Sequence, residues 1–112
     1  MSDYELPVTI SSVRHEFGTF FDRVRLLYNL AFFKEEKGYR AEAVKKYADE
    51  LFEANRISEY VHSIIGEAIQ NFTLLSPVKL KEMNPTKLEQ LSKWINISIY
   101  DINGEINDLM SK

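Results

Sequence analysis

Two histidines are the side chains best suited to acid–base or metal chemistry in this sequence. His62 follows Glu59 by three residues, and this spacing places both side chains on one face of a helix. Carboxylate-bridged metal sites in helical bundles need two such pairs and two further glutamates. The other histidine, His15, has Ser12 at the matching position, so no second pair exists. We therefore predict no metal site and no cofactor, and we interpret His15 as a structural or surface residue.

Arg56 and His62 form a second pairing, with five residues between them. Such a pair supplies a cation for a phosphate group and a side chain that can transfer a proton. The spacing resembles the Arg-x(4–6)-His motif of the HEPN ribonuclease superfamily, whose members are small helical bundles of similar length. The resemblance implies an RNA-cleaving site built from the Arg and His of two dimer-related chains. The sequence departs from the family's pattern at Ile57, where a polar residue usually follows the arginine.

Other catalytic patterns are absent from the sequence. There is no cysteine, which excludes thiol catalysis, disulfides and cysteine-based zinc sites. The four glycines are isolated and form no phosphate-binding loop. We therefore expect a non-enzymatic protein that acts through protein–protein interaction, as an inhibitor, adaptor, immunity protein or small subunit of an assembly. The alternative is a HEPN-like ribonuclease that uses Arg56 and His62.

Aromatic side chains are concentrated in the first third of the chain, where two adjacent Phe pairs occur. Neighbouring residues of a helix point about 100° apart, so the core of one chain cannot easily bury both members of a pair. Large exposed apolar patches are rare on monomers, and a two-fold contact is the commonest way to cover one. We predict a homodimer or partner surface; a wide buried helix face and an interface around Trp94 are the alternatives. The predicted surface consists of Phe20, Phe21, Tyr28, Phe32 and Phe33.

Basic residues cluster where the first helix gives way to the second, interleaved with glutamates. The net charge of −3 is spread evenly along the sequence, and no segment has the concentrated basic charge of a nucleic-acid binder, so we do not expect a nucleic-acid partner. The cluster is interpreted as a solvated helix end with local ion pairs, or as a contact for an anion or an acidic partner. Its members are Lys34, Lys37, Arg40, Lys45 and Lys46.

Apolar periodicity predicts the helices that must position these residues. A first helix is expected over 12–36, with Ser11 or Ser12 as its N-cap and Lys37-Gly38 at its end. Residues 40–71 carry two apolar stripes that meet out of phase at Asn55-Arg56. This favours one near-continuous helix that shifts its buried face, and a break into two helices is the alternative.

The last third of the sequence contains two Pro-based helix starts. Ser76-Pro77 predicts a short helix through Met83, and Asn84-Pro85 predicts a long one that follows. The segment 94–100 alternates like a β-strand, but a lone strand would have no partner, so a helix is predicted.

The segment from Tyr28 to Leu51 resembles one tetratricopeptide hairpin. The resemblance rests on its small and apolar positions and on Gly38. It implies two antiparallel helices that meet at a tight turn at Gly38, and it carries over no binding residues.

The predicted fold is therefore all-α: an antiparallel bundle of three long helices plus one short helix, with an extended N-terminal arm. The arm covers residues 1–10, and a single domain covers residues 11–112. An apolar share of 45% provides enough material for a core. No apolar stretch approaches the ~20 residues that span a bilayer, and the N-terminus lacks the pattern of a signal peptide. We expect no membrane association and a cytoplasmic location.

Overall fold

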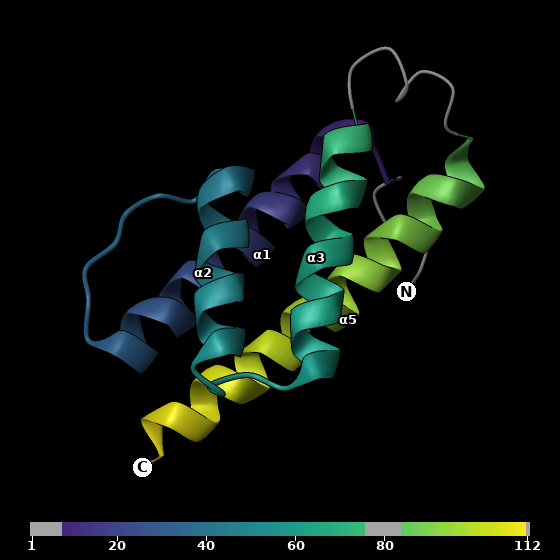
Figure 1. Cartoon of the computed structure of the whole chain (residues 1–112). Helices are drawn as coiled ribbons and strands as arrows, with labels where there is room; N and C mark the ends of the chain where they lie inside the picture. The colour runs from purple at the N-terminus through teal and green to yellow at the C-terminus, as the bar shows by residue number, and fades with distance from the viewer. Residues whose placement is uncertain (1–7, 76–83, 112) are drawn as a thin grey trace.

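The computed structural model of the protein describes residues 8–75 and 84–111. These residues form four helices: α1 (Ile10–Phe32), α2 (Ala41–Glu53), α3 (Glu59–Leu74) and α5 (Pro85–Met110) (Figure 1). The predicted all-α class is confirmed for this part of the chain, and residues 94–100 are helical. The predicted short helix at 76–83 and most of the predicted N-terminal arm lie outside the described residues. Within the described ranges, no helix combines the length and the hydropathy needed to cross a membrane.

α1 begins and ends at residues other than those predicted. Thr9 is its N-cap, because the Thr9 side chain accepts a bond from the Ser12 N–H at 3.0 Å and the Ser12 side chain accepts one from the Thr9 N–H at 2.9 Å. The helix stops at Phe33, which takes the left-handed conformation at φ 54°. The side chain of Asn29 then bonds both backbone groups of Glu36, at 2.9 and 3.0 Å, and holds the chain in an extended path. Gly38 therefore does not cap α1.

The favoured continuous helix over 40–71 is wrong, because the chain breaks between α2 and α3. Asn55 takes the left-handed conformation at φ 57°, and the Arg56 N–H bonds back to the Leu51 carbonyl at 2.8 Å. This is the Schellman pattern, in which Asn can replace Gly. Ser58 then caps α3 by accepting the Val61 N–H at 3.1 Å.

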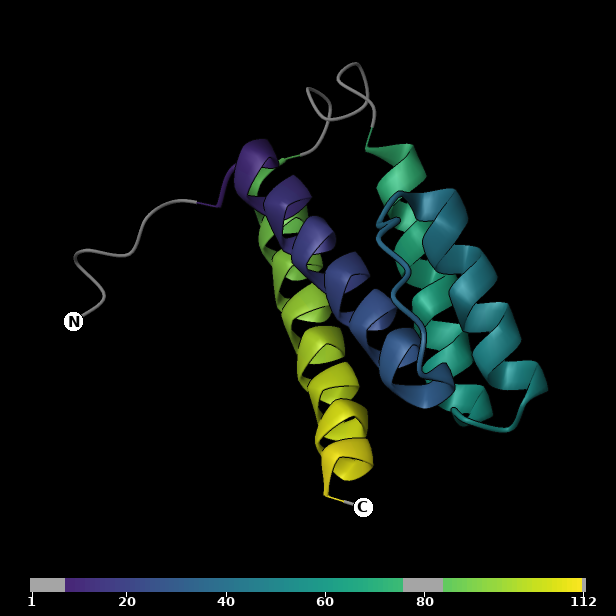
Figure 2. The ribbon, with the colours of Figure 1, turned by 90° about the vertical axis from the view of Figure 1, so that its left-hand side faces the viewer.

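Three of the four helices run in the same general direction, and α3 runs opposite to them (Figures 1 and 2). The segment between α1 and α2 carries the chain back toward the start of α1. Ala41, at the start of α2, lines the same pocket as Gly18, while Glu50, near its end, accepts a hydrogen bond from Tyr28. The antiparallel hairpin with a tight turn at Gly38 is therefore not what joins these two helices. The antiparallel relation holds between α2 and α3.

The length of the segment between α1 and α2 explains how the two helices can run in the same direction. Seven extended residues span roughly 23 Å at about 3.3 Å each, and a 13-residue helix such as α2 is about 20 Å long. The segment from 34 to 40 is therefore long enough to run the length of α2 before that helix begins. α5 also runs alongside α1, where the Glu16 carboxylate near the start of α1 accepts bonds from Ser92 at 2.8 Å and from Asn96 at 2.9 Å.

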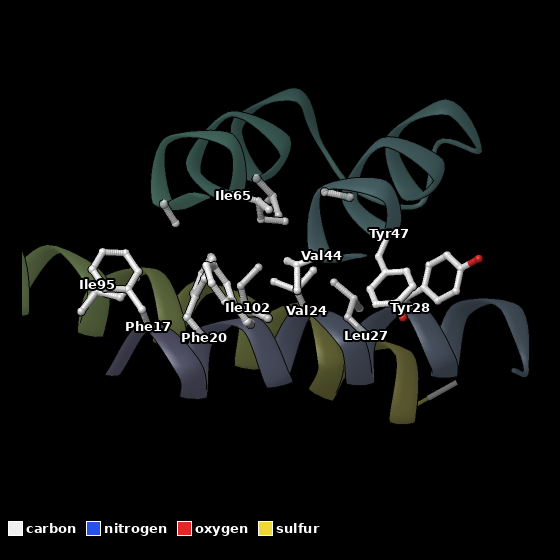
Figure 3. Packing of buried hydrophobic residues seen from close by; sticks show 14 of the residues in the cluster. Phe17, Phe20, Val24, Leu27, Tyr28, Val44, Tyr47, Ile65, Ile95 and Ile102 are labelled. Carbon is white, nitrogen blue, oxygen red and sulfur yellow. The ribbon is translucent and has the colours of Figure 1, made fainter. Parts of the chain in front are cut away.

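The core forms around α1, which contacts each of the other three helices. Figure 3 shows Phe17, Phe20, Val24 and Leu27 of α1 directed into the space between the helices, with Ile65 of α3 across from them. All five side chains are buried. The break at residues 54–58 makes α3 a third neighbour of α1, and three helices cover more of its circumference than two would.

Candidate functional site

The predicted aromatic surface on α1 is wrong for three of its five residues. Phe20, Phe21 and Tyr28 are at most 3% exposed. Phe21 meets the ring of Phe72 edge-on at 5.1 Å, and Tyr28 stacks on Tyr47 at 4.5 Å. The prediction assumed that two helices cover about half of α1, whereas α2, α3 and α5 surround it. Burial raises the pKa of the Tyr28 phenol, and its hydrogen bond to Glu50 raises it further.

The remaining two predicted aromatics differ from each other. Phe32 is half-buried and its ring lies 4.9 Å from that of Tyr28. Phe33 is 95% exposed, and its backbone holds the left-handed conformation. Of the predicted surface, Phe33 alone projects fully into solvent.

A different set of large side chains is exposed on adjoining faces of α3 and α5. Tyr60 of α3 is 63% exposed, and its hydroxyl donates to the Asp101 carboxylate at 3.3 Å. Ile97 lies one helical turn before Asp101 on α5. Tyr100 is three positions from Ile97 and therefore its neighbour on the helix surface, and Ile97 and Tyr100 are both exposed. The Asp101 charge is the main cause that raises the pKa of the Tyr60 phenol, so the phenol stays protonated and donates. We call Tyr60, Ile97 and Tyr100 the α5 face.

The sequence contained a signal for this face. Ile95, Ile97 and Ile99 alternate, and on a helix residues two apart point about 200° apart. The helix buries Ile95 completely and Ile99 partly, and so it turns Ile97 outward. The pattern that resembled a strand therefore marked an apolar residue on the solvent side of α5.

Arg56 and His62 lie at the α2–α3 turn, at one end of the molecule. The His62 ring is half-buried, with Nε2 at 2.9 Å from Asp49 Oδ1, and it stacks on Phe52 at 4.4 Å. Arg56 is exposed in the turn. The structure thus gives His62 a carboxylate partner that the sequence pattern did not identify, and the partner is not Glu59.

Within the described residues, no group of three or more His, Asp or Glu side chains lies close enough together to hold a metal ion. His15 is exposed on α1 beside Asp22, which forms an ion pair with Arg25.

The five predicted basic residues are all exposed but do not converge on one point. Lys34 lies 3.3 Å from the Tyr28 hydroxyl, and Lys45 pairs with Asp49 at 3.3 Å. Lys37 and Arg40 line a hollow at the start of α2 instead, and Lys46 lies farther along that helix.

This hollow shares Tyr39, Arg40 and Glu42 with a pocket of about 390 Å³ between α1, the start of α2 and the end of α3. Phe21 and Phe72 form its apolar floor, and Tyr39 stands at its rim, 61% exposed. Two arginines, Arg14 and Arg40, also line it. Sequence reasoning identified Arg40 but missed Arg14 and Tyr39, because the pocket joins segments far apart in the chain.

Comparison with known proteins adds no relative, since no family model matches the chain and no significant match is found among curated proteins or solved structures.

Proposed function

We propose that the protein is a non-enzymatic interaction protein that acts as a homodimer joined through the α5 face. The observation that supports this proposal is that Ile97 and Tyr100 are exposed about one turn apart on α5, and that the exposed Tyr60 of α3 bonds Asp101 on the same helix. Aromatic and aliphatic side chains gathered in this way lower the free energy when a second protein removes them from water.

Charge complementarity favours a second copy of the chain as the partner. In an antiparallel pairing of two α5 helices with the two-fold axis beside Ile97, Lys93 of one copy faces Asp101 of the other. Both residues are four positions, or about one helical turn, from Ile97. A two-fold contact would form this pair twice.

Size-exclusion chromatography with light scattering tests the dimer. We expect about twice 13.1 kDa at tens of micromolar protein. Ile97→Glu and Tyr100→Glu should each give a monomer, because each places a charge at the centre of the contact. Phe33→Glu is the matched control, since Phe33 is even more exposed than Ile97 and Tyr100 but lies at the end of α1, outside this face. A wild-type monomer, or a dimer that survives Ile97→Glu, would overturn the homodimer.

The second candidate function is RNA cleavage by Arg56 and His62. The observation that favours it is the Asp49–His62 contact at 2.9 Å, because a carboxylate that orients an imidazole is a common element of acid–base catalysis. The experiment is an RNA cleavage assay of the wild type beside His62→Ala. Equal cleavage by both proteins, or none by either, would remove this candidate.

A further inference from the structure

We propose that the pocket between α1, the start of α2 and the end of α3 binds a small molecule that combines a flat apolar ring with an anionic group. The anion would be a carboxylate, sulfonate or phosphate. This site is separate from the α5 face, since no residue of α5 lines the pocket. The inference therefore does not depend on the proposed function.

The shape of the pocket suits a ring. Its volume of about 390 Å³ falls within the range of about 300–1,000 Å³ typical of small-molecule sites. The floor is aromatic, formed by Phe21 and Phe72 in edge-to-face contact. Gly18 forms part of the α1 wall, and a Cβ added there would meet nothing within 4 Å. The room above the Gly18 backbone is therefore open, and a flat ring can approach the helix closely.

The charges that line the pocket suit an anion. The Arg14 guanidinium is held in place, because it donates to the Leu75 carbonyl at 2.7 Å and lies 5.1 Å from the centre of the Phe72 ring. The bond to Leu75 uses one of the five N–H donors of a guanidinium. Arg40 also lines the pocket, at the N-cap of α2, where its side chain makes no capping bond.

The acidic residues nearby do not balance these cations. Among the described residues that line the pocket, Glu42 is the one with a carboxylate, against two arginines. The adjoining hollows around Tyr39 add Lys37 and Arg23, and the Asp22 carboxylate that faces one of them is already paired with Arg25. This concentration of positive charge occurs on a chain whose net charge is −3.

The fluorescent probe 8-anilinonaphthalene-1-sulfonate has the required chemistry, and N-phenyl-1-naphthylamine is its uncharged analogue. We expect saturable binding of one sulfonate probe per folded chain. Gly18→Leu should weaken it by about tenfold or more, because the new side chain occupies the pocket. Gly104→Leu is the matched control, since Gly104 is equally open but lies on α5. Arg40→Gln should weaken the sulfonate probe about tenfold and leave the uncharged analogue unchanged.

Every variant is compared at a temperature where near-ultraviolet circular dichroism shows it fully folded, because the probe also binds partly unfolded chains. Absence of saturable probe binding to the wild type would overturn the proposal. Equal binding by Gly18→Leu and Gly104→Leu would overturn it as well, since the pocket would not be the site. If Arg40→Gln weakened both probes equally, the assigned anion contact would be wrong.

Discussion

Asp49 Oδ1 lies 2.9 Å from His62 Nε2, and this contact ties the end of α2 to the start of α3. The His62 ring also lies nearly parallel to that of Phe52, at an angle of 9°. The His62 hydrogen bond is the main cause that lowers the pKa of the Asp49 carboxyl, and Lys45 at 3.3 Å lowers it further. The α2–α3 turn is therefore held by a contact that depends on the Asp49 charge.

Asp49→Asn should lower the free energy of unfolding near neutral pH by about 0.5 kcal/mol, the size usual for a partly exposed ion pair. A folded-state pKa below the ordinary value of about 3.9 means that this contribution is complete above about pH 5 and is lost as the pH falls through the folded value. Urea unfolding at a series of pH values should show the wild type and the variant converging in acid. Asp108→Asn is the control. If the unfolding free energies of the wild type and Asp49→Asn differed by the same amount at every pH, the stabilising role assigned to the Asp49 charge would be contradicted.

Leu27→Ala and Leu51→Ala should each lower the free energy of unfolding by about 2–5 kcal/mol, because both side chains are buried and their loss leaves a cavity. Leu74→Ala removes the same atoms from a side chain that is 45% exposed, and should cost less than about 1 kcal/mol. Denaturant unfolding measures all three changes. Equal losses of unfolding free energy for Leu27→Ala and Leu74→Ala would mean that burial of the side chain does not determine the cost of its removal.

The helices of this protein could be predicted wherever one apolar stripe runs without a shift. The stripe of Val13, Phe17, Phe20 and Val24 correctly indicated the buried face of α1. Helix ends were less predictable, because they depend on single residues that can substitute for glycine. Phe33 and Asn55 take left-handed conformations. The end at Phe33 was not predicted, and the break at Asn55-Arg56 was only the alternative prediction, because neither residue is a glycine or a proline.

The candidate sites were largely beyond sequence reasoning because they depend on topology. Nothing in the pattern showed that the segment after Phe33 returns toward the start of α1 and places Arg40 in the same pocket as Arg14. The sequence also did not show how many helices pack against α1. For that reason Phe20 and Phe21 were placed on a surface, although three helices bury them.

Glycine positions give a third prediction. Gly18→Ala, Gly66→Ala and Gly104→Ala should each raise the free energy of unfolding by about 0.5–1 kcal/mol, because alanine favours the helix. At all three positions a new Cβ meets nothing within 4 Å, so the added methyl group should cause no clash with the described part of the chain. At Gly38 a Cβ would lie 3.1 Å from the Tyr47 hydroxyl, and Gly38→Ala should give no gain. Thermal unfolding of the four variants tests this, and stabilisation by Gly38→Ala alone would contradict it.

Phe33→Gly should raise the free energy of unfolding by about 0.5–1 kcal/mol. A bulky side chain at φ 54° is strained by contact between its Cβ and the following carbonyl, and glycine removes that contact. Little burial is lost in exchange, because Phe33 is 95% exposed. Asn55→Gly should gain less, since asparagine tolerates the left-handed conformation better than phenylalanine.

Phe33→Ala separates the backbone from the ring. Alanine keeps the Cβ, so this variant should show none of the gain if backbone strain is the cause. Denaturant unfolding of Phe33→Gly and Phe33→Ala, at a protein concentration low enough to prevent association, measures the difference. Equal stabilisation by both would assign the effect to the exposed ring. Destabilisation by both would mean that the Phe33 ring is covered in solution, and the exposure on which this prediction depends would then be wrong.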